Sequence, residues 1–167
     1  MNNVEWTPEW LTETIKLLRT HGSDTQFIEV KKAHGGYPGS LDATLSSFSN
    51  SSTGGIIICG LDENNDFAPV GVYDPADLEK TLGNKLRRGL KPPNTMESGT
   101  ILYEDAKIFV AAIPPLPPYE RPAYIGGKAY VRSGDGDHEM SRHETDLMVA
   151  QRTRTGFDEE PVEYTSI

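Results

Sequence analysis

The spacing of apolar residues predicts a helix over residues 8–20. Four apolar side chains would form one stripe along it: Trp10, Leu11, Ile15 and Leu18. Thr7 is suited to cap this helix, and Pro8 fits its first position. The His-Gly pair at 21–22 is expected to end it.

The segment at residues 27–31 alternates in the manner of a strand. Ile28 and Val30 would face one side of a sheet, and Glu29 and Lys31 would face the other. A carboxylate and an ammonium group would therefore share one face of this strand.

Four consecutive apolar residues at 56–59 predict a central strand that is buried on both faces. Before it, Ser40 is placed to cap a helix. Leu41, Leu45 and Phe48 recur there at helical spacing.

The second half of the chain contains further clear signals. Asp74 and Pro75 predict the cap and first position of a helix. Residues 101–113 predict a hairpin that turns at 104–107, and residues 129–132 predict a last short strand.

A capping box formed by Ser141 and Glu144 predicts a final helix that runs to about Arg152. From Gly156 onward the chain is acidic and shows no regular pattern, which indicates a tail or the start of a linker. The order of elements predicts an α/β (α+β) fold, a single domain with a mixed sheet flanked by helices. We expect this domain to span residues 1–155 and the tail to span 156–167.

Composition narrows the function classes. The 167 residues include 16 Lys or Arg and 25 Asp or Glu, a net charge of -9. This acidic composition argues against nonspecific binding of nucleic acid, because most of the affinity in such binding comes from basic side chains that neutralise phosphates. The one cysteine, Cys59, excludes an internal disulfide and a cysteine-cluster metal site. With no apolar run of membrane-spanning length and no signal-peptide order, we expect a cytoplasmic protein that does not enter a membrane.

Three carboxylates suggest metal chemistry. Glu29 lies on the predicted strand, Asp24 precedes it, and Asp62 follows the buried strand. Oxygen ligands of this kind bind Mg²⁺ or Mn²⁺, and Lys31 would stabilise charge in a nuclease transition state. The alternative interpretation is a strand face that carries ordinary charges, and the residues alone favour that alternative.

A basic cluster gives a second candidate site. Lys85, Arg87, Arg88 and Lys91 follow the helix that begins at Asp74, and Arg132 lies on the last predicted strand. These side chains would bind nucleic-acid phosphates if they converge. Helix-terminal charge bias explains the cluster equally well.

The order of several motifs resembles the Schlafen-type AlbA-like domain. The motifs, in chain order, are Phe27-Ile28-Glu29-Val30-Lys31, Leu45-Ser46-Ser47-Phe48-Ser49-Asn50, Gly54-Gly55, Gly60-Leu61-Asp62, Pro69-Val70-Gly71-Val72 and Ala129-Tyr130-Val131-Arg132-Ser133-Gly134. The resemblance covers residues 24–151. Ser47 and Ser49 stand where the family has small residues, often alanine, and Ser133-Gly134-Asp135 replaces its commoner ending.

The resemblance implies a DNA-binding domain at the N-terminus of a bacterial helicase-like transcriptional regulator, with further domains beyond residue 167. For such a binding domain we expect DNA more than RNA as the partner and a homodimer as one assembly. We expect no cofactor, or Mg²⁺ or Mn²⁺ if the protein is a nuclease. The family also includes ribonucleases, and their metal-binding acids correspond to Asp24, Glu29 and Asp62.

Three functions therefore stand as hypotheses. The first is nucleic-acid binding in a transcriptional regulator, and the second is a ribonuclease that depends on Mg²⁺ or Mn²⁺. The third is a sensor or protein-interaction module that binds no nucleic acid, which the net charge of -9 supports.

Overall fold

The computed structural model describes residues 5–134 and 136–159. Its helices are α1 (Pro8–His21), α2 (Leu41–Asn50), α3 (Pro75–Asn84) and α4 (Arg142–Glu159). Its strands are β1 (Ile28–Lys31), β2 (Gly55–Cys59), β3 (Leu61–Asp62), β4 (Ala68–Pro69), β5 (Leu90–Lys91), β6 (Glu97–Tyr103), β7 (Ala106–Ile113), β8 (Tyr124–Ile125), β9 (Lys128–Ser133) and β10 (Gly136–Glu139). Short 3₁₀ turns cover Glu63–Asn65 and Pro118–Glu120, and a π-helical turn covers Lys85–Gly89.

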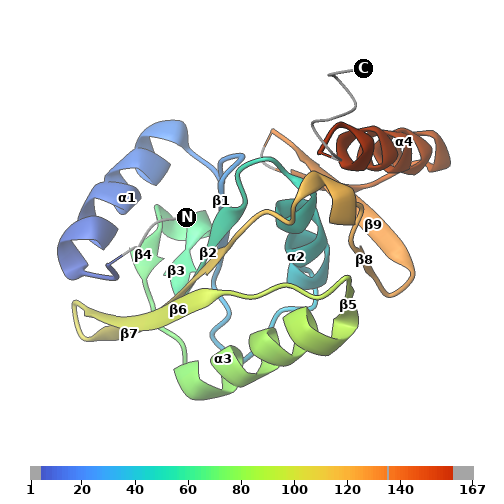
Figure 1. Cartoon of the computed structure of the whole chain (residues 1–167). Coiled ribbons are helices and arrows are strands. Elements are labelled where there is room, and N and C mark those ends of the chain that lie inside the picture. Colours follow the sequence, from blue (N-terminus) through green and yellow to red (C-terminus); the bar gives the residue numbers. More distant parts are fainter. Residues whose placement is uncertain (1–4, 135, 160–167) are drawn as a thin grey trace.

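The main sheet is mixed, as the sequence predicted. Its strand order is β1-β2-β7-β6 (Figure 1). β1 pairs with β2 in parallel, whereas β7 is antiparallel to both β2 and β6. The predicted central strand is β2, which lies between β1 and β7 and is largely buried.

Helices cover both faces of this sheet (Figure 1). On one face, Leu11 and Leu18 of α1 pack with Val30 and Ile58 in one apolar cluster. On the other face, the apolar residues of α2 and α3 pack with Ile57, Cys59, Phe109, Ala111 and Ile113 in a second cluster. Side chains alternate along a strand, so the residues on one face of β2 and β7 belong to the first cluster and those on the other face belong to the second.

A second sheet, with strand order β10-β9-β8-β5, packs against α2. Asn50 at the end of α2 joins the two: its Oδ1 accepts a bond of 2.7 Å from the Ala123 amide, and its Nδ2 donates to the Tyr130 carbonyl at 3.0 Å. The Asn50 side chain therefore connects the end of α2 to the backbone of the second sheet through hydrogen bonds.

Three of the four predicted helix caps form side-chain hydrogen bonds, whereas Ser40 precedes α2 without a capping hydrogen bond from its side chain. The Thr7 hydroxyl accepts from the Trp10 amide, and the Asp74 carboxylate accepts from the Asp77 amide. At α4, Ser141 and Glu144 make the reciprocal pair of hydrogen bonds expected of a capping box.

The structure differs from the sequence predictions at some boundaries. β6 begins at Glu97 instead of residue 101, and α3 continues into the π-helical turn before β5. The last helix runs to Glu159, although irregular chain was expected from Gly156. The rest of the predicted tail, 160–167, lies outside the described residues. Within those residues, no helix has the length and apolar character needed to cross a membrane.

Candidate functional site: a buried ionic cluster and a basic end

The buried cluster consists of Asp24, Glu29, Arg132 and Asp137. Glu29 lies on β1 and points away from the α1 face, because Ile28 and Val30 face α1 as predicted. Arg132 and Asp137 are register partners in the β9–β10 pair. Arg132 of the second sheet therefore meets Glu29 of the main sheet, although Glu29 lies 103 residues earlier in the chain.

Arg132 uses its guanidinium group entirely inside the protein. Nη1 donates to Glu29 Oε1 at 2.7 Å and to Asp137 Oδ1 at 3.0 Å. Nε and Nη2 donate to the Thr25 carbonyl at 3.1 and 2.7 Å, and Nη2 also donates to the Ile28 carbonyl. The side chain is 2% exposed. Contrary to the sequence prediction, Arg132 does not lie where a nucleic-acid phosphate would reach it.

The surroundings of Arg132 keep it charged. Burial lowers its pKa, but the hydrogen bonds and ion pairs with Glu29 and Asp137 outweigh burial and raise the pKa above the usual arginine value. The Phe48 ring lies 5.2 Å from the guanidinium carbon. Asp137 also accepts from the Ser47 hydroxyl at 2.6 Å. Arg132 therefore joins β1, α2 and β10 as a structural element of the fold.

Asp24 is a neutral acid next to Glu29. Its pKa is raised from 3.8 to about 8, mainly by burial and also by the neighbouring Glu29 carboxylate. The Val30 amide donates to Asp24 Oδ1 at 3.0 Å and acts in the opposite direction. The raised pKa favours the protonated form of Asp24 at neutral pH.

The three acids of the metal hypothesis do not form one group. Glu29 Oε2 lies 3.1 Å from Lys31 Nζ, and Arg132 holds its other oxygen. Asp62 pairs instead with Lys32 at 3.8 Å. Among the described residues, no three His, Cys, Asp or Glu side chains are grouped so that they could hold a metal ion. In this arrangement both oxygens of Glu29 are already paired, one with Lys31 and one with Arg132.

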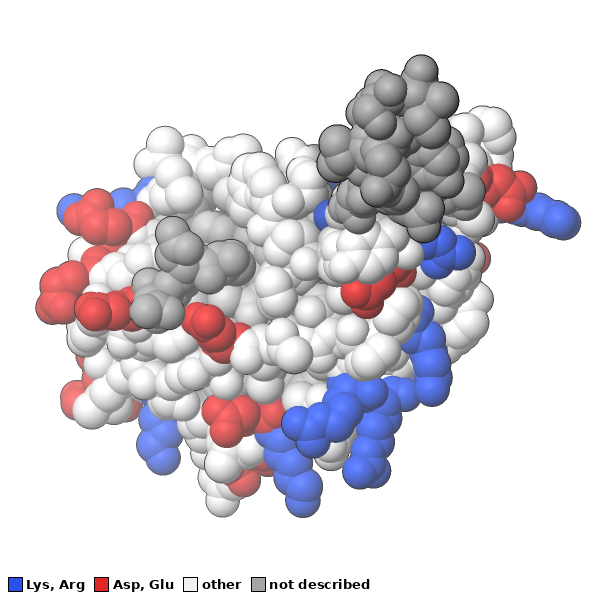
Figure 2. All heavy atoms as spheres, in the orientation of Figure 1, with Lys and Arg blue, Asp and Glu red and all other residues white. Residues whose placement is uncertain are grey.

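The basic end consists of Arg87, Arg88 and Lys91, in the π-helical turn after α3 and in β5. All three side chains are exposed. None of them makes an ion pair within the described part of the chain, although several other surface cations do. Figure 2 shows Lys and Arg gathered at the lower right, below and beside the end of α3, with Asp and Glu gathered at the left around α1. The net negative charge therefore conceals a local positive surface.

Lys85, the fourth predicted cation of this cluster, is only partly available. Its Nζ lies 3.2 Å from Asp42 Oδ2 and 5.6 Å from the centroid of the Tyr37 ring. The Tyr37 hydroxyl in turn donates to Asp42 Oδ1 at 2.6 Å. Burial and this contact with Asp42 raise the pKa of Tyr37, so the phenol keeps its proton. Lys85 connects the π-helical turn to α2.

The Gly54-Gly55 turn has a structural explanation. Gly54 has φ of +73°, and a Cβ atom there would overlap the Ile113 carbonyl oxygen. A Cβ on Gly55 would meet the Phe48 ring. The Gly54 amide donates to the Ser51 hydroxyl at 2.8 Å. Close packing between α2 and β2 explains both glycines.

Sequence reasoning missed Asp137 and the role of Phe48. Asp137 carries no motif of its own, and its meaning appears only once β10 pairs with β9. The signal that was present is Gly134, whose φ of +64° suits the turn between these strands. By contrast, Cys59 is buried as expected, and burial raises the pKa of its thiol to about 12.

Comparisons with known proteins agree with this fold. A family model described as Schlafen, AlbA_2 matches residues 24–141. The structure is similar to the solution structure of the N-terminal domain of a protein related to the ATP-dependent DNA helicase RecG, from Nitrosomonas europaea, with a TM-score of 0.61 and 22% identity over 83% of this chain and 97% of that chain. It is also similar to the crystal structure of the DIP2311 protein from Corynebacterium diphtheriae, with a TM-score of 0.53 and 14% identity over 84% of this chain and 28% of that chain. No curated protein matches the chain.

Proposed function

The chain belongs to the Schlafen, AlbA_2 family, and we propose that it binds nucleic acid, DNA above RNA, through phosphate contacts at its basic end. The observation that carries this proposal is the set of three exposed cations Arg87, Arg88 and Lys91, which form no ion pair with any residue that the structure describes. Cations that are not already neutralised release counterions from a nucleic acid when they bind its phosphates. The resemblance to regulator domains supports a role in transcription as the context of this binding.

The same charges explain how an acidic domain binds a polyanion. Exposed charges further apart than about 10 Å are largely screened at an ionic strength of about 0.1 M. The acids around α1 therefore act weakly on a ligand at the opposite side of the molecule (Figure 2). Local charge at the basic end decides the contact, and net charge lowers the affinity only at low salt.

The test is a titration of a fluorescently labelled DNA, followed by anisotropy at several salt concentrations. We expect binding that weakens with salt, and we expect the triple variant Arg87→Gln/Arg88→Gln/Lys91→Gln to reduce the magnitude of the logarithmic salt slope by about 2 to 3. Lys107→Gln removes an exposed cation at the other end of α3 and serves as the matched control. It should leave the slope nearly unchanged.

Two results would contradict the proposal. A flat titration at low salt would favour the interaction-module hypothesis. Cleavage of the probe in Mn²⁺ that Glu29→Gln abolishes would instead favour the nuclease, and it would show that Glu29 exchanges its partners for a metal.

A further inference from the structure

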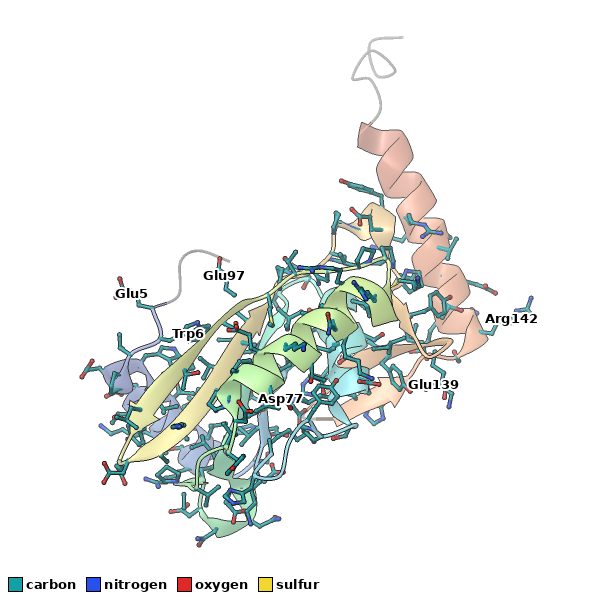
Figure 3. All side chains as sticks on the ribbon, turned by 90° about the horizontal axis from the view of Figure 1, so that it is seen from below. Glu5, Trp6, Asp77, Glu97, Glu139 and Arg142 are labelled. Atoms are coloured by element: carbon teal, nitrogen blue, oxygen red, sulfur yellow. The ribbon has the colours of Figure 1, made fainter. Side chains whose placement is uncertain are left out.

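β6 is an edge strand of the main sheet. It pairs with β7 on one side, and among the described residues no strand lies on its other side. β6 has seven residues, whereas the opposite edge strand, β1, has four and packs against β3. Figure 3 shows the hairpin of β6 and β7 beside α3, with the labelled Trp6 and Glu97 on the side of the hairpin away from α3. The long edge of β6 is therefore open to a further strand.

The turn of the hairpin determines which main-chain groups of β6 face outward. Glu104 and Asp105 both have positive φ, and Tyr103 faces Ala106 across them. In a two-residue turn of this kind, the closing pair exchanges both of its hydrogen bonds. Every second residue back along β6 does the same, so the main-chain groups of the residues between them point away from β7. These outward-facing groups have no hydrogen-bond partner among the described residues, and they belong to Ser98, Thr100 and Leu102.

β6 lacks the features that usually keep an edge strand from pairing. It contains no proline and no lysine, and its residues pair one-to-one with β7, so no bulge interrupts the edge. Its one charged residue, Glu97, stands at the start of the strand. Leu102, near the other end, is 66% exposed. An edge of this kind is a template for another strand.

A second copy of β6 complements this edge in antiparallel register. With a twofold axis at Thr100, this residue faces Thr100 of the other copy, and Leu102 faces Ser98. All three outward-facing residues then occupy hydrogen-bonded positions, and each exchanges an N–H···O=C bond in both directions with the residue opposite. The largest of the three side chains lies across from the smallest, which allows the strands to pack closely.

Charges beside the edge match across the same axis. Thr100, Glu79 and Lys107 border one open hollow on the α3 side of the hairpin. Ser98 donates to Glu79 at 2.9 Å, and Leu102 is the register partner of Lys107. Because two strand spacings amount to about 10 Å, the Lys107 side chain of one copy reaches Glu79 of the other. Twofold symmetry makes this contact twice.

We propose that two copies of this chain join through β6, antiparallel about a twofold axis at Thr100, into one continuous sheet. The open main-chain groups would also accept an unrelated extended peptide. The match between Glu79 and Lys107 favours a second copy, because among the described residues Lys107 is exposed and takes part in no ion pair. The proposal goes beyond the nucleic-acid binding put forward above and does not depend on it.

The first experiment is sedimentation velocity of the chain, without nucleic acid, between about 5 and 500 µM. We expect the average mass to rise with concentration from 18.4 kDa toward twice that value. Thr100→Pro removes an outward-facing N–H that β7 does not use, so it should raise the dissociation constant by at least about tenfold. Thr100→Val keeps this N–H and is the matched control.

Two results of this experiment would overturn the proposal: a chain that stays monomeric at the highest concentration, or a Thr100→Pro variant that associates like the wild type. Should Thr100→Pro fail to fold by circular dichroism, Leu102→Glu replaces it. That side chain is exposed, and the new carboxylate would lie beside Glu79 of the second copy. Either outcome leaves the DNA titration above to be judged on its own result.

A charge exchange tests the identity of the partner and the register. Glu79→Lys alone and Lys107→Glu alone each place like charges at both contacts, so each should weaken association by about threefold or more. An equimolar mixture of the two variants restores opposite charges at both contacts and should recover the association of the wild type. A mixture that associates no better than either variant would contradict the register.

Hydrogen exchange followed by NMR locates the contact along the chain. In the monomer, the amides of Gly99 and Ile101 should exchange slowly because they donate to β7, whereas those of Thr100 and Leu102 should exchange fast. At concentrations that favour the dimer, exchange at Thr100 and Leu102 should slow by at least about tenfold. Fast exchange at Thr100 in a sample that sediments as a dimer would show that another face joins the copies, and the proposal would be wrong.

Discussion

At the scale of single residues, burial separates the arginines of this domain by role. The Arg132 side chain is 2% exposed, and its nitrogen atoms all donate hydrogen bonds to acceptors within the protein. Arg87 and Arg88 instead extend into solvent. The buried acids Asp24 and Glu29 follow the same rule, since one is protonated and the other is paired twice. Charge in the interior stabilises structure here, and charge at the surface is available for a ligand.

Asp24→Asn should make stability less dependent on pH. The pKa of Asp24 is raised from 3.8 to about 8 by folding, so between these pH values the folded state holds a proton that the unfolded chain has lost. The free energy of unfolding of the wild type therefore falls as pH rises across this window. Asparagine cannot titrate, but it can still accept from the Val30 amide and donate toward Glu29.

Urea unfolding at pH 5, 7 and 9 measures this effect. The variant should gain stability relative to the wild type as pH rises. Asp105→Asn, at an exposed turn position with φ of +66°, is the control and should follow the wild type. Parallel curves for wild type and Asp24→Asn would mean that Asp24 is ionised in the folded state.

Arg132→Gln should be strongly destabilising. The change leaves Glu29 and Asp137 buried without their cation, which costs about 3–5 kcal/mol in comparable sites. Arg132→Lys keeps the charge but loses the forked geometry, so its loss should be intermediate. Chemical denaturation measures both variants against Arg142→Gln, whose side chain is 95% exposed. A loss below about 1 kcal/mol for Arg132→Gln would contradict the structural role.

At the scale of elements, the junction between α2 and β2 requires a glycine, which has no side chain, at the start of β2. The Phe48 ring fills the space where Gly55 would carry a Cβ atom, and Phe48 itself is fully buried. The same ring contacts the Arg132 guanidinium. The packing of one helix end therefore reaches both sheets.

Gly55→Ala should reduce stability by about 1–3 kcal/mol, because an added methyl group overpacks the core against Phe48. Phe48→Leu removes the ring atoms that the methyl group would meet. The double variant should therefore lose less than the sum of the two single losses, which thermal or urea unfolding can measure. Strict additivity would show that the clash is relieved elsewhere.

Local chemistry made some of these elements predictable and left others hidden. The caps at Thr7, Asp74 and Ser141 act within three residues, so the sequence displays them directly. The two-residue strands such as β5 are too short to show a period, and the π-helical turn has no pattern of its own. The ion pair between Glu29 and Arg132 joins residues far apart in the chain, so no spacing rule reveals it.

At the scale of the whole molecule, charge is distributed unequally. Acidic side chains gather around α1 at one side, and basic side chains gather at the end of α3 (Figure 2). An approaching polyanion is therefore attracted to one side and repelled by the other. This asymmetry affects the orientation in which a nucleic acid approaches the domain more than it affects the binding affinity.

A comparison of Glu9→Lys with Arg87→Glu tests whether affinity for DNA depends on the position of a charge or on the net charge of the domain. Both substitutions change the net charge by two units, in opposite directions, at exposed positions. At about 0.15 M salt the Glu9 change should alter affinity for DNA by less than about twofold, because screening removes its effect at that distance. Arg87→Glu should weaken binding by about tenfold or more, since it removes a direct contact and adds repulsion. Equal and opposite effects would mean that net charge governs binding, as the acidic composition first suggested.

The buried thiol of Cys59 also makes this protein well suited to site-specific labelling. It is the single cysteine of the chain, it is 1% exposed, and its raised pKa leaves almost no reactive thiolate at neutral pH. A maleimide dye would therefore react selectively with a cysteine introduced at an exposed position, such as Thr95→Cys in the segment before β6. The wild-type chain thus serves as its own background without a reactive cysteine for fluorescence or spin-label measurements.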